Sequence, residues 1–193
     1  MATIADPQDL LDFWFAPEQA IHWFAVDTGF DARLRERFAD TAQAAAAGQL
    51  DGWADTPPGW LALLITLDQL PRNLHRGDAR AWMQDVKAQR VALSGIDRGD
   101  DRRLPPLQRV FAYLPLEHAE NSALQRRSVT LFETLCAEVP PAQRPQFEEF
   151  VLYARRHADV IDRFGRFPHR NAVLGRTSTP QETSYLAEPG AGF

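Results

Sequence analysis

The segment Leu63–Gly77, LLITLDQLPRNLHRG, decides the fold of this chain. It is apolar at first, then carries Asp68 and Gln69, and reaches Pro71 before a run of arginine, asparagine and histidine. A helix that is apolar on every side belongs in a protein core, and an interior proline removes a backbone hydrogen bond. We therefore expect a buried helix over about residues 60–70, a break at Pro71, and polar side chains that form the floor of a site.

Working outward, the rest of the chain shows helical spacing of its apolar residues. We expect further helices at about residues 7–16, 27–47, 78–94, 105–114, 122–139 and 142–163, with Gly95 capping the helix that ends at Ser94. Thr179-Pro180-Gln181-Glu182 predicts a capping box and a short last helix. No stretch alternates as a strand does. The predicted fold is all-α: a single domain over residues 1–193, an antiparallel array of seven or eight helices, with residues 188–193 frayed.

Composition narrows the class of protein. The formal net charge is −5 and no basic tail is present, which argues against a nucleic-acid partner. The single cysteine, Cys136, excludes an intramolecular disulfide and fits a reducing compartment. The first ten residues lack the basic start of a signal peptide, and no apolar run approaches the ~20 residues of a membrane span. We expect a cytoplasmic protein without a membrane partner, and the oligomeric state stays open.

Polar residues follow an apolar helix at three places, residues 68–76, 113–118 and 163–171. Helical proteins build pockets from such helix ends, so we expect the three segments to converge on one pocket. Two of them also echo each other, since Leu-Pro-Arg-Asn at 70–73 resembles Phe-Pro-His-Arg-Asn at 167–171. Ordinary turn chemistry explains the echo as well as a paired ligand site does, because proline stops helices and asparagine caps them.

Arginines concentrate in one part of an acidic chain. Residues 153–176 hold six arginines and two aspartates, a net charge of +4 in a protein of net −5. Arginine binds carboxylate or phosphate with a planar, always-charged fork, so the segment predicts a small anionic ligand. The alternative is internal ion pairing of these arginines with acids of the same chain; the candidate acids are Asp68, Glu117, Asp159 and Asp162.

Three long motifs, LDQLPRNLHRGDARAW, RVFAYLPLEHAEN and YARRHADVIDRFGRFPHRNAVLGRTSTPQE, resemble the bacterial domain-of-unknown-function family 924. The resemblance covers almost the whole chain from the aromatic Phe13–Phe15 onward, and departs at Leu70, where the family's motif typically has phenylalanine. It implies a helical fold similar to the tetratricopeptide-like superfamily, although no 34-residue repeat is visible. It implies no reaction.

The candidate site residues come from these motifs. Candidates for proton transfer are histidines, together with an aspartate that could act as base or nucleophile: Asp68, His118, His157 and His169. Candidates for ligand binding are Gln69, Arg72, Asn73, Arg76, Tyr113, Glu117, Arg156, Arg163, Arg166, Arg170 and Asn171. Asp68 is expected to be the counter-charge that orients Arg72, or Arg166 and Arg170.

The function that follows is a pocket lined by Arg, His and Asn that binds a small anionic molecule, phosphate or carboxylate. A metal-independent enzyme fits this pattern, but no nucleophile elbow or phosphate-cradling glycine loop is present. The histidines lack metal-ligand spacing, and nearby arginines would repel a cation, so we expect neither a metal nor a cofactor. Two alternatives remain: a helical scaffold that binds an acidic peptide or protein without catalysis, and a purely structural network of arginines and acids.

Overall fold

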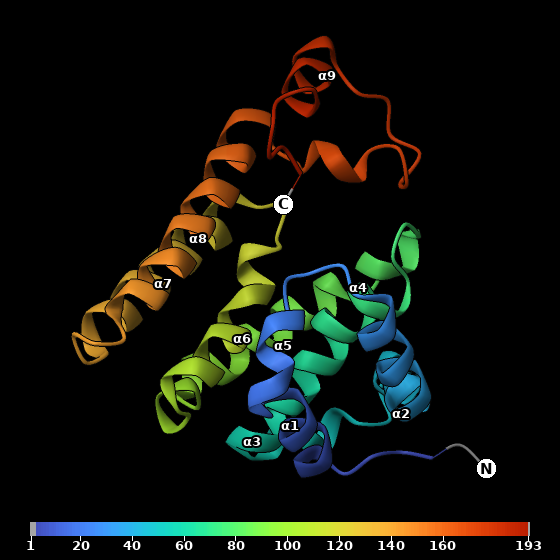
Figure 1. Ribbon diagram of the computed structural model, residues 1–193, viewed down its shortest axis with the longest axis vertical. Helices are drawn as coiled ribbons and strands as arrows, with labels where there is room; N and C mark the ends of the chain where they lie inside the picture. Colours follow the sequence, from blue (N-terminus) through green and yellow to red (C-terminus); the bar gives the residue numbers. More distant parts are fainter. Residues whose placement is uncertain (1–2, 193) are drawn as a thin grey trace. The chain divides into compact units, whose positions relative to one another are not determined.

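A computed structural model describes residues 3–192 of the chain, and within that range every regular element is helical (Figure 1). The all-α prediction is therefore confirmed. The chain divides into two compact units. Unit 1 comprises Met1–Arg76 and Arg80–Pro115, and unit 2 comprises Gly77–Ala79 and Leu116–Phe193. The prediction of a single domain over residues 1–193 stays a prediction, as does fraying of residues 188–193, of which Phe193 lies outside the described residues.

The described residues of unit 1 form six α-helices. The last of these helices continues into unit 2. The six helices are α1 (Pro7–Trp14), α2 (Thr28–Ala46), α3 (Pro57–Leu64), α4 (Leu70–Leu74), α5 (Asp85–Arg98) and α6 (Pro106–Glu117). Side-chain caps fix three of the starts, because Asp6, Asp27 and Thr56 each accept a hydrogen bond from a backbone N–H in the first helical turn. Short 3₁₀-helices lie at Pro17–His22, Asp51–Asp55, Ala79–Trp82 and Asp101–Arg103.

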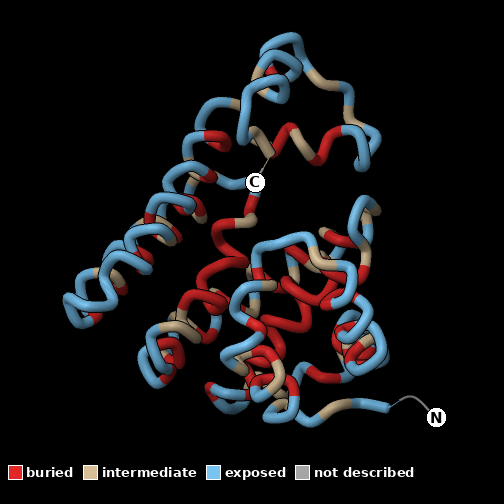
Figure 2. Tube along the Cα trace, viewed as in Figure 1, coloured by how far each residue is buried: buried red, intermediate tan, exposed pale blue. Residues whose placement is uncertain are grey.

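The helical run from Pro57 to Leu74 forms the buried centre of unit 1. Figure 2 shows α3 and its continuation buried along their length. The predicted break at Pro71 is wrong, because the helical backbone runs on to Leu74 through a π-helical turn at Ile65–Gln69. In that wider turn the N–H of Leu70 reaches the carbonyl of Ile65, and Pro71, which has no N–H to place, begins the next turn. Asp68 and Gln69 are therefore buried in the middle of a helical run.

The prediction that Gly95 caps a helix is also wrong. The α5 helix begins later and ends later than expected, at Arg98, and its cap is Gly99 with φ 78°. Gly95 lies inside the helix against Trp60, where an added Cβ would come within 2.2 Å of the indole ring. The glycine is needed for the close approach of α5 to α3, which sequence spacing alone does not reveal.

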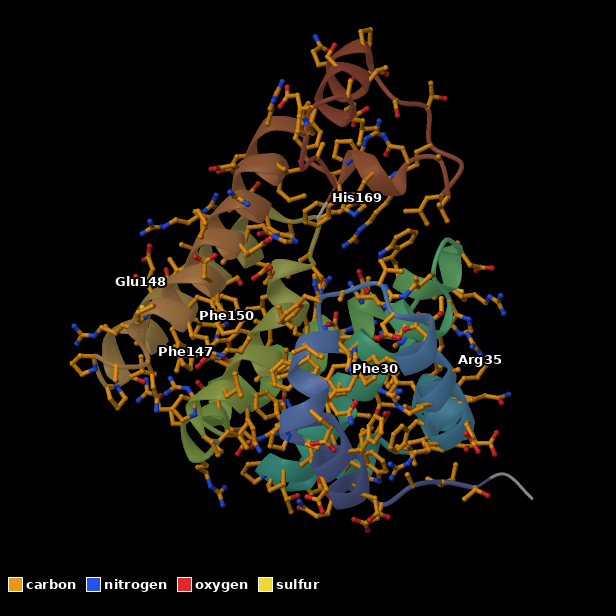
Figure 3. The ribbon with its side chains drawn as sticks, in the orientation of Figure 1. Phe30, Arg35, Phe147, Glu148, Phe150 and His169 are labelled. Carbon is orange, nitrogen blue, oxygen red and sulfur yellow. The ribbon has the colours of Figure 1, made fainter. Side chains whose placement is uncertain are left out.

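Unit 2 is built on two long helices, α7 (Ser122–Glu138) and α8 (Arg144–Phe164), which pack side by side (Figure 1). Phe147 and Phe150 lie on the opposite side of α8 from Glu148 (Figure 3), and the Phe150 ring stacks near Phe132 of α7. After α8 comes a 3₁₀-helix at Pro168–Arg170 and then α9 (Pro180–Leu186). The predicted capping box of Thr179 and Glu182 is confirmed.

Among residues 3–192, no helix combines the length and the apolar character that crossing a membrane requires.

Candidate functional site: two polar clusters

The predicted site residues fall into both units. Six of them lie in unit 1: Asp68, Gln69, Arg72, Asn73, Arg76 and Tyr113. The other nine lie in unit 2: Glu117, His118, Arg156, His157, Arg163, Arg166, His169, Arg170 and Asn171. The convergence of residues 68–76, 113–118 and 163–171 on one pocket stays a prediction.

In unit 1, Arg72 lies between two buried aspartates. Its Nη1 is 3.1 Å from Asp68 Oδ1 and 3.0 Å from Asp85 Oδ1, and its Nη2 donates to Asp85 Oδ2 at 3.1 Å. Burial opposes the charged form of Arg72, but the two carboxylates outweigh it and raise the pKa of the guanidinium. Gln69 donates to Asp68 Oδ2 at 2.6 Å. Asp68 is thus a counter-charge to Arg72, which is the first of the two pairings expected for it from the sequence.

Asn73 and Arg76 bind a third aspartate, Asp31 of α2. Asn73 Nδ2 donates to Asp31 Oδ1 at 2.8 Å, and Arg76 forms an ion pair with the same carboxylate. A second Arg76 nitrogen donates to the carbonyl of Ala25 at 3.1 Å. These contacts join α4 to α2, so the predicted binding residues of this segment are engaged in holding unit 1 together.

Tyr113 is engaged in the same way. Its hydroxyl donates to Asp101 at 2.7 Å and accepts from Arg109 at 3.1 Å. Burial and the bond to Asp101 raise the pKa of Tyr113, so the phenol stays protonated.

We call six residues of unit 1 the aspartate cluster: Asp31, Asp68, Arg72, Asn73, Arg76 and Asp85. Sequence analysis missed Asp31 and Asp85, whose only signal is a charged residue on an inward helix face.

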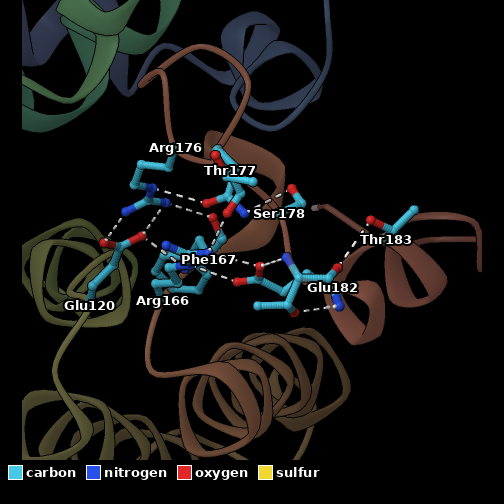
Figure 4. A network of polar contacts seen from close by, with 10 residues as sticks. Glu120, Arg166, Phe167, Arg176, Thr177, Ser178, Glu182 and Thr183 are labelled. Atoms are coloured by element: carbon cyan, nitrogen blue, oxygen red, sulfur yellow. Dashed lines mark hydrogen bonds and ion pairs between the residues drawn. The ribbon is translucent and has the colours of Figure 1, made fainter.

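In unit 2, Arg166 and Glu182 form a bidentate ion pair (Figure 4). The two nitrogen–oxygen distances are 2.6 and 2.8 Å, and Arg166 also donates to the carbonyl of Thr177 at 2.9 Å. Hydrogen bonds from Arg166, joined by the backbone N–H of Thr179, lower the pKa of Glu182 to about 2. The pair fastens α9 to the segment after α8, and it balances the charge of Arg166 without a ligand.

Arg176 and Glu120 form a second bidentate pair in the same network, with distances of 2.7 and 2.9 Å (Figure 4). Arg176 also donates to Asn171 Oδ1 at 2.9 Å, and Asn171 donates to Ser178 at 3.1 Å. The backbone N–H of Phe167 donates to Glu120 at 2.8 Å. Asn171 is therefore part of a structural network. Glu120, Arg176 and Glu182 were missed because their partners lie far away in the sequence.

Arg156 and Arg163 contact aromatic rings. The Arg156 guanidinium lies 5.5 Å from the centre of the Tyr153 ring, and that of Arg163 lies 4.6 Å from the Phe164 ring and 5.7 Å from the Tyr185 ring. Both arginines are exposed. Cation–π contacts at such exposed positions are worth about 0.5–1 kcal/mol, which accounts for their placement.

The remaining five candidates of unit 2 come together, and we call them the imidazole cluster: Glu117, His118, His157, His169 and Arg170. The His118 and His157 ring centres are 6.2 Å apart. The His157 and His169 rings lie 5.6 and 5.7 Å from the ring of Phe167, which lies under the guanidinium of Arg170 at 4.5 Å. Arg170 donates to the carbonyl of His118 at 3.2 Å. The end of α6, the middle of α8 and one 3₁₀-helix supply these side chains.

The tautomer of His157 follows from its contacts. Its Nδ1 is 2.9 Å from the carbonyl oxygen of Tyr153 and 3.2 Å from Glu117 Oε1. A carbonyl only accepts, so Nδ1 carries the hydrogen and Nε2 keeps a lone pair. Burial lowers the pKa of His157 to about 3; the charge of Arg170 and the protonated forms of His118 and His169 act in the same direction, against the hydrogen bond to the Tyr153 carbonyl. His157 is therefore a neutral, oriented base at pH 7.

His169 lies in the same positive field. Burial lowers its pKa to about 4, and Arg170 is the largest electrostatic cause. His118 and His169 are half-buried, whereas Glu117, His157 and Arg170 are buried. The half-buried imidazoles thus form the accessible edge of the cluster. Gly192 lies against His169, since an added Cβ would be 3.1 Å from the His169 Cβ.

Across residues 3–192, no three His, Cys, Asp or Glu side chains gather in a way that could hold a metal ion.

A groove lies elsewhere in unit 2, between α7 and α8. Its volume is about 470 Å³, and its lining residues are Glu133, Cys136, Ala137, Arg144, Glu148, Val151, Leu152 and Arg155. Arg155 is bonded there to Glu133 at 2.6 Å. The lining includes two arginines and two glutamates, so the groove has no excess of either charge. It includes none of the predicted site residues.

Comparison with known proteins identifies the family. Residues 10–190 match the family described as bacterial protein of unknown function (DUF924), and the chain belongs to it. A solved structure, described as a protein of unknown function, ATU0120, from Agrobacterium tumefaciens, is 39% identical. The match has a TM-score of 0.83 and covers 94% of this chain and 96% of that one. No curated protein matches the sequence. The family resemblance is confirmed; the tetratricopeptide-like label stays a prediction.

Proposed function

We propose that the imidazole cluster of unit 2 binds a small anionic molecule through a carboxylate or phosphate group. The observation that carries the proposal is the local field. The pKa values of His157 and His169 are lowered first by burial and then by positive neighbours, Arg170 among them. The permanent charge of Arg170 beside these neutral imidazoles favours an anion.

The geometry supplies complementary donors. The guanidinium carbon of Arg170 lies 4.5 Å from the centre of the Phe167 ring, and a guanidinium binds carboxylate or phosphate through two parallel hydrogen bonds. His118 and His169 lie at the accessible edge, where a bound anion would raise their affinity for protons and gain hydrogen bonds from them. Behind them, His157 is buried and neutral at pH 7.

The aspartate cluster does not support the same function. Arg72 and Arg76 are each paired with buried carboxylates of unit 1. An anion entering there would have to replace a carboxylate that already satisfies the arginine. The predicted binding residues of unit 1 are accordingly explained as structure, and the proposal rests on unit 2 alone.

The alternatives are supported less well. A structural network accounts for Arg166 and Arg176 through Glu182 and Glu120. An acidic peptide would need a positive surface, and the groove between α7 and α8 carries two arginines and two glutamates.

The test is calorimetric titration of the full chain with inorganic phosphate and with succinate. We expect saturable binding that weakens about tenfold or more, a loss of ~1.4 kcal/mol, in Arg170→Gln and in His169→Asn. Arg163→Gln is the matched control, because the contacts of this arginine are with the rings of Phe164 and Tyr185. Circular dichroism checks that each variant is folded. Absence of binding in the wild type, or equal losses in Arg163→Gln, would refute the proposal.

A further inference from the structure

One exposed stripe of α8 carries alternating charges around a single apolar residue. Residues three or four positions apart lie on the same side of a helix, and we call five such exposed residues of α8 the α8 stripe: Arg144, Glu148, Leu152, Arg155 and Asp159. Figure 3 shows Glu148 on the side of α8 away from Phe147 and Phe150. His157 is buried, on the inner side of the same helix. The α8 stripe is therefore separate from the imidazole cluster.

The α8 stripe borders the groove between α7 and α8. All of its residues except Asp159 line this groove, which has a volume of about 470 Å³. Leu152, the apolar member of the stripe, is 42% exposed. Glu133, Cys136 and Ala137 of α7 form the opposite wall. A groove beside an exposed leucine can take an apolar side chain from a second helix, because helices pack by placing the side chains of one between those of the other.

Most of the charged side chains in the α8 stripe have no hydrogen bond or ion pair among residues 3–192; these are Arg144, Glu148 and Asp159. Arg155 differs, because its Nη2 lies 2.6 Å from Glu133 Oε1. Three of the four charges are therefore available to a second molecule, and their order along the helix decides which kind of molecule fits.

The order of the charges makes the α8 stripe complementary to itself. Arg144 and Asp159 are equally far along the sequence from the midpoint between residues 151 and 152, and so are Glu148 and Arg155. If a second copy of α8 lies antiparallel about a two-fold axis at this midpoint, each arginine of the stripe faces an acid of the other copy. Such an isologous interface uses the same patch on both copies. A uniformly acidic or basic partner would instead meet like charges at two of the four charged positions.

We propose that two copies of this chain associate through the α8 stripe, with their α8 helices antiparallel and the two Leu152 side chains at the centre. Each Leu152 enters the groove of the other copy, beside Cys136 and Ala137. Arg144 pairs with Asp159 and Glu148 pairs with Arg155, and the two-fold axis repeats each pair. Exposed ion pairs contribute little to stability. The leucines and the grooves therefore supply most of the attraction, and the charges select the partner and its orientation.

Sedimentation equilibrium of the full chain over a range of concentrations tests the association. We expect a reversible monomer–dimer equilibrium in the wild type and no dimer in Leu152→Asp, which would bury two carboxylates at the centre of the interface. Tyr153→Asp is the matched control, because Tyr153 is 45% exposed and lies outside the groove, and it should dimerise as the wild type does. Circular dichroism checks that each variant is folded. A wild type that stays monomeric up to about 1 mM, or a Leu152→Asp variant that still dimerises, would overturn the proposal.

Reversal of charge tests the pairing itself. Arg144→Glu sets acid against acid at both ends of the interface, and Asp159→Arg sets arginine against arginine. Each variant alone should dimerise at least tenfold more weakly than the wild type, a loss of ~1.4 kcal/mol. An equimolar mixture of the two variants should form a heterodimer of about wild-type affinity, because every facing pair then has opposite signs. A mixture that associates no better than the separate variants would overturn the proposal.

Discussion

The segments 70–73 and 167–171 have nearly the same letters and different surroundings. In unit 1, Arg72 lies between the carboxylates of Asp68 and Asp85, and Asn73 donates to Asp31. In unit 2, Arg170 lies over the Phe167 ring among imidazoles whose pKa values its charge helps to lower. A proline followed by arginine and asparagine therefore places an arginine between carboxylates in one unit and an arginine among imidazoles in the other. The residues that other parts of the same unit place beside the arginine decide which of the two surroundings forms.

The largest effect should come from unbalancing the aspartate cluster. Arg72→Ala leaves Asp68 and Asp85 buried without their shared counter-charge, and breaking a buried pair in this way costs about 3–5 kcal/mol. Urea unfolding followed by tryptophan fluorescence measures the loss. Arg90→Ala is the control, since this exposed arginine donates to the carbonyl of Val86 in its own helix, and its stability should stay within about 0.5 kcal/mol of the wild type. If Arg72→Ala lowers the free energy of unfolding by less than ~1 kcal/mol, the aspartate cluster does not stabilise unit 1 as described.

Acid should weaken unit 2 through His157. Its pKa is lowered in the folded state, from 6.5 to about 3, so the unfolded chain takes up a proton first as the pH falls. The stability contributed by the neutral imidazole is complete above pH ~6.5 and is lost progressively below it, by about 2 kcal/mol at pH 5. Hydrogen exchange of α8 at pH 7 and pH 5 measures this. His157→Gln should make the stability of unit 2 less dependent on pH between 7 and 5. The same pH dependence in this variant as in the wild type would contradict the account.

Glu182→Gln tests the part of unit 2 that is purely structural. Glutamine can still close the capping box with Thr179, but it loses the charge that pairs with Arg166. We expect a loss of about 1 kcal/mol, confined to α9 in hydrogen exchange, and unchanged anion binding. Glu182→Ala removes both contacts and should cost more. If Glu182→Gln abolishes anion binding, the Arg166 network and the imidazole cluster are one site rather than two.

The smallest effect should come from Arg155→Ala. Its ion pair with Glu133 is exposed on both sides, and such pairs contribute about 0–0.5 kcal/mol. The urea midpoint should hardly move. A loss above 1 kcal/mol would show that the groove between α7 and α8 holds unit 2 together more strongly than its exposed charges suggest.

Local chemistry made much of the fold predictable. Asp6 and Thr179 start helices as caps because their contacts lie within one turn, and apolar spacing located α2, α7 and α8 closely. Gly95 and Pro71 were misjudged for a tertiary reason. The glycine makes room for Trp60, and the π-helical turn before the proline lets a buried helix continue. Neither circumstance is visible in a window of neighbouring residues.

The site was predictable in its residues and not in their pairing. The three motifs supplied every member of the imidazole cluster, because histidine and arginine stand out in an acidic chain. The acids that engage the other arginines, Asp31 and Asp85 among them, are tens of residues or a helix away and look like ordinary surface charges. Gln125 and Ser128 are fully buried in α7, and a polar residue on a helix gives no sign of burial until the fold is known.

The comparison between the units is tested most directly by the ring-proton resonances of the histidines during a titration with succinate. The chain has five histidines, of which His22 and His75 lie in unit 1. The account predicts saturable shifts in the ring protons of His118, His157 and His169, with those of His22 and His75 unmoved. Shifts limited to the unit 1 histidines, or none at all, would contradict it.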